Sequence, residues 1–208
     1  MVTQKKYMEI VRHYEKCFAE YGDSNLGVDW PNQSDAITRY RVMLDIVKEK
    51  GDLVSLLDLG CGAGHLYDHL KELETPIQYS GLDISDKFIS VCRNKYPDVM
   101  FYEMDILDDV SLLPEFDYIV ANGVFTEKRS LDYEEMLDYF KEMIKVMFSK
   151  CSRGIAFNVM STYVEWKRDD LFHLPLNDLS EFLVSEVSQN FVIRNDYGLY
   201  EYTSYVYK

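Results

Sequence analysis

The spacing of apolar residues predicts two amphipathic helices near the start of the chain. Apolar and aromatic side chains recur at helical intervals in two groups, Tyr7, Ile10, Val11, Tyr14 and Phe18, and then Ile37, Tyr40, Met43, Leu44 and Val47. The stretch between them, residues 22–33, contains two glycines and the pair Trp30-Pro31, which favours a loop. We expect Ser34 to cap the second helix.

From residue 53 onward, short apolar runs alternate with helical stretches. The runs cover residues 53–59, 77–82, 99–102, 116–121 and 154–159. Runs of this kind are typical of strands that are buried on both faces of a sheet. Helical spacing returns between them, at residues 66–73, 85–96 and 131–148.

The end of the chain has a different pattern, with two extended segments at residues 191–197 and 200–207 joined around Gly198. Such a pair predicts an antiparallel hairpin. The alternation of strands and helices before it predicts a doubly wound α/β fold, a mostly parallel sheet with helices on both faces. We expect one domain over residues 1–208, with a helical cap at 1–50 and the core at 51–208.

Composition and charge narrow the class of protein. Apolar residues make up 47% and charged residues 28% of the chain, as in ordinary globular proteins. The net charge of −14, without any local run of basic residues, argues against a nucleic-acid polymer as substrate. The charged N-terminus and the absence of a long apolar segment argue against a signal peptide and a membrane span, so we expect a cytoplasmic protein.

The four cysteines lie far apart and form no CxxC motif or Cys/His cluster with the spacing of a zinc site. The sequence therefore predicts reduced thiols and no metal site.

The most informative motif is a glycine-rich turn between a predicted strand and a predicted helix. Asp58 ends the strand, and the turn that follows contains Gly60, Cys61, Gly62 and Gly64. Glycines permit a positive φ and let a ligand approach the backbone closely. The helix that follows adds the partial positive charge of its N-terminal amide groups.

Two further acidic positions follow the next two predicted strands. Asp83 and Ile84 come after the second strand, and Asp105 and Ile106 come after the third. An acidic residue at the tip of the second strand can accept hydrogen bonds from ribose hydroxyls. Ligands of open α/β sheets bind at this carboxyl edge.

Taken together and in this order, these segments resemble the class I S-adenosylmethionine-dependent methyltransferases over roughly residues 53–208. The resemblance implies that the glycine turn and Asp58 bind the methionine and ribose parts of the cofactor, Asp83 with Ile84 the ribose, and Asp105 with the Ile106 backbone the adenine. Asn122 and Gly123, at the end of the fourth strand, would border the transferable methyl group. The terminal hairpin would supply strands six and seven of a seven-stranded sheet, the last of them antiparallel.

Trp30 and Arg39 are further candidates, because a loop and helix before the core can cover the cofactor. Core packing of Trp30 and a solvated Arg39 remain the alternative.

Two other functions stay open at this point. A nicotinamide-dependent oxidoreductase prefers the turn GxGxxG, whereas here the turn is GxGxG and His65 stands at the expected third glycine. A protein that binds the cofactor without catalysis would carry the same motifs.

The acceptor of the methyl group is expected to be a small molecule with a reactive oxygen or nitrogen. The sulfonium is already activated, so the protein has to align the acceptor and exclude water. The segment 160–175 is expected to form a lid, and its His173 is the predicted general base. A structural role for His173 is the alternative.

Overall fold

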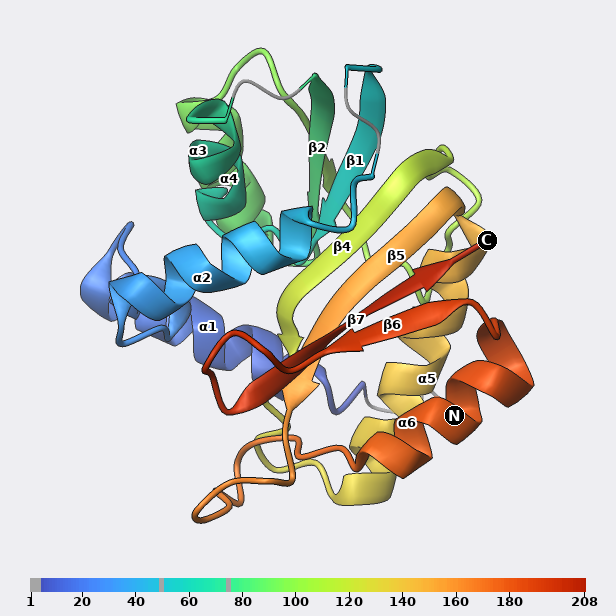
Figure 1. Ribbon diagram of the computed structural model, residues 1–208. Helices are drawn as coiled ribbons and strands as arrows, with labels where there is room; N and C mark the ends of the chain where they lie inside the picture. Colours follow the sequence, from blue (N-terminus) through green and yellow to red (C-terminus); the bar gives the residue numbers. More distant parts are fainter. Residues whose placement is uncertain (1–4, 49–50, 74–75) are drawn as a thin grey trace.

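The computed structural model describes residues 5–48, 51–73 and 76–208 and contains one seven-stranded sheet (Figure 1). The strands are β1 (Val54–Leu59), β2 (Ile77–Asp83), β3 (Met100–Glu103), β4 (Phe116–Phe125), β5 (Cys151–Met160), β6 (Phe191–Arg194) and β7 (Glu201–Tyr207). Their order across the sheet is β3-β2-β1-β4-β5-β7-β6. Strands β1 to β5 pair in parallel, and β7 pairs antiparallel with both β5 and β6. The predicted doubly wound sheet with an antiparallel C-terminal strand is confirmed.

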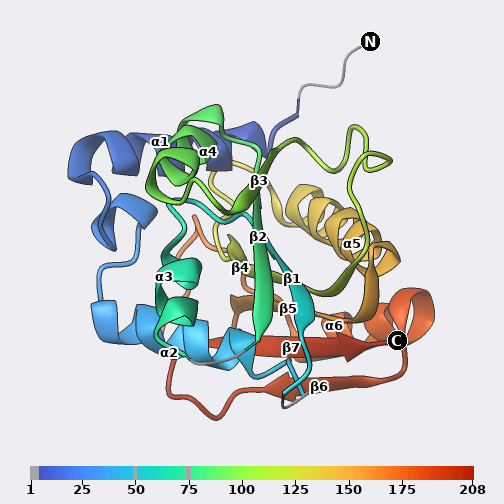
Figure 2. The ribbon, with the colours of Figure 1, turned by 90° about the horizontal axis from the view of Figure 1, so that it is seen from above.

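The helices cover both faces of this sheet. They are α1 (Met8–Tyr21), α2 (Gln33–Leu44), α3 (His65–Lys71), α4 (Asp86–Lys95), α5 (Tyr133–Ser149) and α6 (Leu176–Phe182), with a short 3-10 turn at Leu26–Val28 and a π turn at Leu183–Val187. Helices α2, α3 and α4 pack with one core cluster, and α5 and α6 with the other (Figure 2). Among the described residues, no helix combines the length and the apolar character that a membrane span requires.

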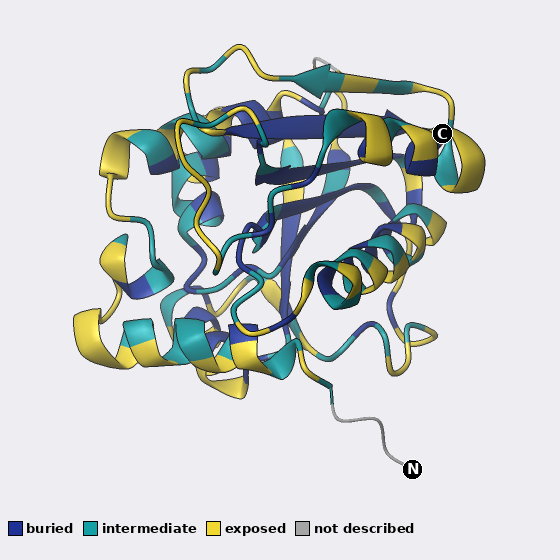
Figure 3. Ribbon diagram, turned by 90° about the horizontal axis from the view of Figure 1, so that it is seen from below, coloured by how far each residue is buried: buried dark blue, intermediate teal, exposed yellow. Residues whose placement is uncertain are grey.

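Alternating side chains explain the two clusters. Neighbouring strand residues point to opposite faces, so Leu56 packs toward α2 to α4 while Leu57 packs toward α5 and α6. Tyr118 and Ile119 divide in the same way on β4. Figure 3 shows the result, with buried strands inside and exposed helix faces outside. Burial on both faces is why these strands appear in the sequence as continuous apolar runs.

The sequence pattern did not predict the N-terminal cap of α2 or the presence of α6. Asn32, not Ser34, caps α2, because the Asn32 side chain accepts the hydrogen bond from the Ser34 backbone N–H at 3.0 Å. Helix α6 was not predicted at all, and it follows Pro175, which stands at its N-terminal boundary. The prediction for Ser34 is therefore wrong, although the helix itself is where the apolar spacing put it.

The strand ends also differ from the predicted ranges. Strand β4 continues to Phe125, so Asn122 and Gly123 lie inside it, near a register irregularity between Ala121 and Phe125. The hairpin is present, with Gly198 at φ 76°, but β6 is short and ends at Arg194. The boundary expected between cap and core touches residue 50, outside the described residues, and that division stays a prediction.

Candidate active site

A cavity lies at the carboxyl edge of the sheet, at the ends of β1, β2 and β4 and beneath α1. This edge is the switch point of the fold, since the chain runs from β1 to β2 on one side and resumes at β4 on the other. Eleven predicted residues line the cavity: Trp30, Asp58, Gly60, Cys61, Gly62, Asp83, Ile84, Asp105, Ile106, Asn122 and Gly123. The sequence motifs thus converge on one place.

The glycine turn is shaped by close approach and by left-handed backbone. Gly60 has φ 74°, and a Cβ there would overlap Val124 Cγ2 of β4. Gly62 has φ 51° and more open surroundings. Gly64, at φ 78°, is the N-terminal cap of α3, and a Cβ there would lie 2.7 Å from the Tyr96 ring. Gly64 does not line the cavity; it lets α3 begin directly after the turn.

Asp58 is a buried carboxyl group beneath the turn. It is 3% exposed and accepts a hydrogen bond from the Tyr79 hydroxyl at 2.8 Å. Burial raises the pKa of Asp58 to about 7, against the lowering effect of Tyr79, and the charge of Asp83 raises it further. A cationic ligand group nearby would favour the ionised form.

Asp83 connects the tip of β2 to the glycine turn. Its carboxylate accepts hydrogen bonds from the backbone N–H groups of Gly62 and Ser85, both at 2.9 Å. Burial raises the pKa of Asp83, and these backbone donors partly oppose that shift. The side chain therefore holds the turn in addition to facing the cavity.

Asp105 is held from the N-terminal segment. Lys5 Nζ and Tyr7 Oη both lie 2.6 Å from its Oδ2, and the Leu107 N–H donates to Oδ1 at 3.0 Å. Burial alone would raise the pKa of Asp105, but Lys5 and Tyr7 outweigh it and the net pKa is lowered. Tyr7 also stacks on Tyr139 with ring centroids 4.7 Å apart, which adds two aromatic walls to this end of the cavity.

Asn122 offers two buried polar atoms to the cavity. It lines the cavity, yet both polar atoms of its carboxamide are buried and have no hydrogen-bond partner. Such groups in native proteins normally have partners. Asn122 and the buried carboxyl groups of Asp58 and Asp83 line the same cavity, and aromatic walls lie beside Asp105. These groups suit a ligand with a polar amino-acid part and a flat ring, and S-adenosylmethionine has both.

Trp30 and Arg39 have different positions. Trp30 lines the cavity and packs against Gly123, whereas Arg39 lies behind it, with its guanidinium 5.1 Å from the Trp30 ring centroid. Arg39 forms an ion pair with the buried Glu201 at 2.7 Å. Arg39 thus contacts the wall of the cavity and not the cavity itself.

His173 lies outside the cavity lining, in a segment held against β5. Its Nδ1 is 2.7 Å from the Ser161 carbonyl oxygen, and its Nε2 is buried without a partner. The flanking residues Phe172 and Leu174 are fully buried. Tyr163 and Trp166, farther out on the same loop, are 76% and 70% exposed. The catalytic role of His173 stays a prediction.

Helix α1 contributes residues that the sequence analysis did not select. Tyr7, at the N-terminal boundary of α1, lines the cavity together with Ile10, Val11 and Tyr14 of the helix. The Tyr14 hydroxyl donates to the Gly123 carbonyl oxygen at 3.4 Å, and the Thr126 hydroxyl donates to the same oxygen at 2.9 Å. The apolar stripe predicted the helix, but it did not reveal that part of the stripe faces a ligand cavity.

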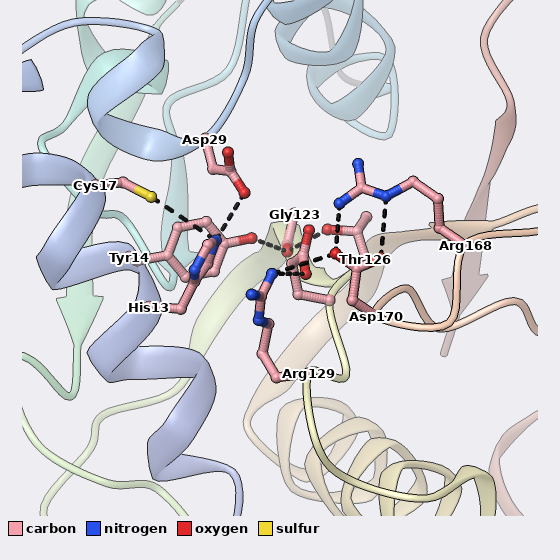
Figure 4. Close-up of polar contacts among 10 residues, drawn as sticks. His13, Tyr14, Cys17, Asp29, Gly123, Thr126, Arg129, Arg168 and Asp170 are labelled. Atoms are coloured by element: carbon pink, nitrogen blue, oxygen red, sulfur yellow. Dashed lines mark hydrogen bonds and ion pairs between the residues drawn. The ribbon is translucent and has the colours of Figure 1, made fainter.

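Polar side chains gather on both sides of Gly123 (Figure 4). On one side, His13 Nε2 lies 2.7 Å from Asp29 Oδ2. On the other, Arg129 forms ion pairs with Glu127 at 3.1 Å and with Asp170 at 3.4 Å. Burial raises the pKa of Glu127, and Arg129 opposes the shift. We call these residues the mouth cluster.

Two residues of the mouth cluster have an unusual backbone. Asp29 at φ 57° and Arg129 at φ 51° are, in the part of the chain that the structure describes, the residues other than glycine with positive φ. The left-handed region is uncommon for such residues and costs them free energy. Strained backbone of this kind is concentrated at functional sites.

His13, Cys17 and Asp29 are also potential metal ligands, with ligand atoms within 4.8 Å of one another. Two ligands bound tetrahedrally to zinc at 2.0–2.1 Å would lie about 3.3 Å apart. The 2.7 Å between His13 and Asp29 is instead a hydrogen-bond distance. The geometry therefore favours a His–Asp pair.

Comparison with known proteins agrees with this geometry. Residues 57–146 match a family model described as a methyltransferase domain. The Mycobacterium tuberculosis protein Rv1506c, whose name assigns it provisionally to the methyltransferases, is 29% identical over 160 residues, which are 76% of this chain and 95% of that protein. The malonyl-[acyl-carrier protein] O-methyltransferase of Bacillus anthracis is 28% identical over 101 residues, 48% of this chain and 34% of that protein.

A solved structure extends the likeness to the whole fold. Magnesium protoporphyrin IX methyltransferase from Synechocystis, solved with bound S-adenosylmethionine, superposes with a TM-score of 0.65. The superposition covers 100% of this chain and 98% of that chain, and the two sequences are 18% identical.

Proposed function

Since the chain is a class I S-adenosylmethionine-dependent methyltransferase, we propose that it methylates an oxygen or nitrogen atom of a small molecule that enters beside Gly123. The observation that carries this proposal is the mouth cluster, a set of paired polar side chains around Gly123. The relatives support it, because their names include an O-methyltransferase and an enzyme acting on a porphyrin.

The cofactor residues are assigned in the same proposal. The turn at Gly60, Cys61 and Gly62, with Asp58 and Asn122, would hold the methionine part of the cofactor. Asp83 and Ile84 would hold the ribose, and Asp105 and Ile106 the adenine. The cofactor supplies an electrophilic methyl group, so the protein's tasks are to orient the acceptor, exclude water and take up a proton.

The proton acceptor is assigned to a histidine, because a hydroxyl nucleophile must lose its proton during transfer and an ammonium group must lose one before its nitrogen can attack. His173 is the candidate from the sequence. The His13–Asp29 pair is a second candidate, favoured by its place beside Tyr14, which lines the cavity. In this pair the carboxylate would stabilise a protonated imidazole.

Formation of S-adenosylhomocysteine with a panel of phenols, carboxylic acids and primary amines tests the function. Binding of the cofactor without turnover on any of them would favour the non-catalytic alternative.

His13→Ala and His173→Ala separate the two candidate bases. Loss of the true base should lower turnover by about 10²–10⁴-fold at saturating cofactor, with cofactor affinity nearly unchanged. His69→Ala, on α3, is the matched control. Equal turnover in all three variants would leave alignment, without a histidine base, as the mechanism.

A further inference from the structure

A chain of buried hydrogen bonds joins strand β7 to the cavity wall at Gly123. The Gly123 N–H donates to Asn158 Oδ1 at 2.8 Å, and Asn158 Nδ2 donates to Glu201 Oε1 at 2.9 Å. Asn158 is fully buried on β5, and Glu201, 1% exposed, opens β7. The backbone of β4 is thus fixed at the cavity by a side chain two strands away.

A second set of contacts returns from Glu201 to the same place. Arg39 Nε donates to Glu201 Oε2 at 2.8 Å, and the guanidinium lies over the Trp30 ring. Trp30 in turn packs so closely on Gly123 that a Cβ there would lie 3.0 Å from Trp30 Cζ2. The contacts Gly123, Asn158, Glu201, Arg39, Trp30 and back to Gly123 form a closed ring.

The ring contains a buried carboxylate, that of Glu201. A carboxylate that is almost completely buried costs desolvation free energy, which its ion pair offsets only when the geometry is good. Glu201 meets that condition by using both oxygens, one for Asn158 and one for Arg39. The planar guanidinium is also suited to lie on an aromatic ring while it holds a carboxylate. These contacts fix the position of Arg39 between Glu201 and Trp30.

We propose that Glu201 is a positioning residue for the cofactor, which acts through Asn158 on the Gly123 backbone and through Arg39 on Trp30. Both groups line the cavity, and neither Glu201 nor Arg39 does. The antiparallel strand β7 therefore fixes the position of Trp30 against Gly123 in the cavity wall. A looser ring lets Trp30 move away and weakens binding of the cofactor.

The test uses S-adenosylhomocysteine as probe and the fluorescence of Trp30 as a local signal. The chain has two tryptophans, so Trp166→Phe leaves Trp30 as the reporter. In that background, Arg39→Met/Glu201→Gln removes the ion pair without leaving a single buried charge. We expect affinity for S-adenosylhomocysteine to fall by about tenfold, the equivalent of one lost hydrogen bond, and Trp30 emission to shift to longer wavelength.

Two further variants keep the test decisive. Arg39→Lys retains the charge but not the planar group, so the emission should shift while the melting temperature stays close to that of the parent. Arg194→Met removes another arginine, which pairs with Asp45 and Asp196, and should change neither signal. Unchanged affinity and emission in the double variant, with only a lower melting temperature, would show that the ring is structural and overturn the proposal.

Discussion

The cavity and the mouth cluster beside it are built in different ways. The cavity wall around Asp58, the glycine turn and Asp83 is held by backbone geometry and by buried groups whose donors are backbone N–H groups or one hydroxyl. The mouth cluster, whose residues do not line the cavity, is instead held by pairs of polar side chains, His13 with Asp29 and Arg129 with Glu127 and Asp170. Side-chain pairs are easier to replace than a backbone turn. A constant cofactor and a variable acceptor are compatible with this division.

The largest effect on this comparison should come from Gly60→Ala. The new Cβ would meet Val124 in a left-handed backbone position, so we expect a loss of about 2–4 kcal/mol in the free energy of unfolding and loss of cofactor binding. Gly198→Ala is the control, because φ is similar at 76° and nothing lies within 4 Å of the added Cβ. Urea unfolding should show a smaller loss there, of about 1–2 kcal/mol. Equal losses in the two variants would mean that the close contact between Gly60 and Val124 of β4 does not contribute to the free energy of unfolding.

Asp83→Ala should act next most strongly. We expect cofactor affinity to weaken by about 1–3 kcal/mol in calorimetric titration, the range for hydrogen bonds to a charged group. Thermal stability should also fall, because the Gly62 and Ser85 N–H groups lose their acceptor. Asp86→Ala, an exposed position in the first turn of α4, is the control. Normal affinity in Asp83→Ala would remove Asp83 from the ribose site.

The raised pKa of Asp58 predicts that this residue's contribution to the free energy of unfolding falls as the pH rises. The folded protein keeps Asp58 protonated up to about pH 7, whereas the unfolded chain releases this proton near pH 4. The contribution of Asp58 to the free energy of unfolding should therefore fall between about pH 4 and pH 7, by up to about 1.4 kcal/mol per pH unit, and stay constant above. Urea unfolding of the parent and Asp58→Asn at pH 5, 6 and 7 measures the difference. A difference that does not change with pH would contradict the shifted pKa.

The smallest effect is expected at the edge of the mouth cluster. Arg168 pairs with Asp170 on a partly exposed loop, and such pairs contribute about 0–1 kcal/mol. Arg168→Met should leave unfolding and S-adenosylhomocysteine binding nearly unchanged. A large loss of cofactor affinity in this variant would contradict the distinction between the cavity and the mouth cluster.

The same division explains what the sequence could predict. The glycine turn is contiguous, and Asp83 and Asp105 follow strands that were recognisable as apolar runs, so their meeting at one edge followed from the fold. The pairing of Arg129 with Asp170, 41 residues later, depends on how two loops pack, and no local pattern encodes it. His13 and Asp29 lie 16 residues apart, across a loop whose shape depends on a left-handed residue.

Boundaries were less predictable for a related reason. Asn32 and Ser34 are both good capping residues. Which of them caps the helix depends on the backbone conformation of the preceding loop, which places Asn32 in an extended conformation at the start of α2. Arg39 was a candidate for the cofactor site because the helix before the core can cover the cofactor. Its partner Glu201 is 162 residues away and was invisible from sequence.

The buried link from Gly123 through Asn158 to Glu201 also has a consequence for biosynthesis. The ribosome synthesises the glycine turn, Asp83 and Asp105 before it synthesises β7, and a domain generally folds as a unit. Yet the amide at Gly123 has its acceptor fixed only when residue 201 is in place. A nascent chain that stalls before β7 would present every cofactor motif and still lack a finished cavity wall, so the ability to bind would arise only after β7 has been synthesised.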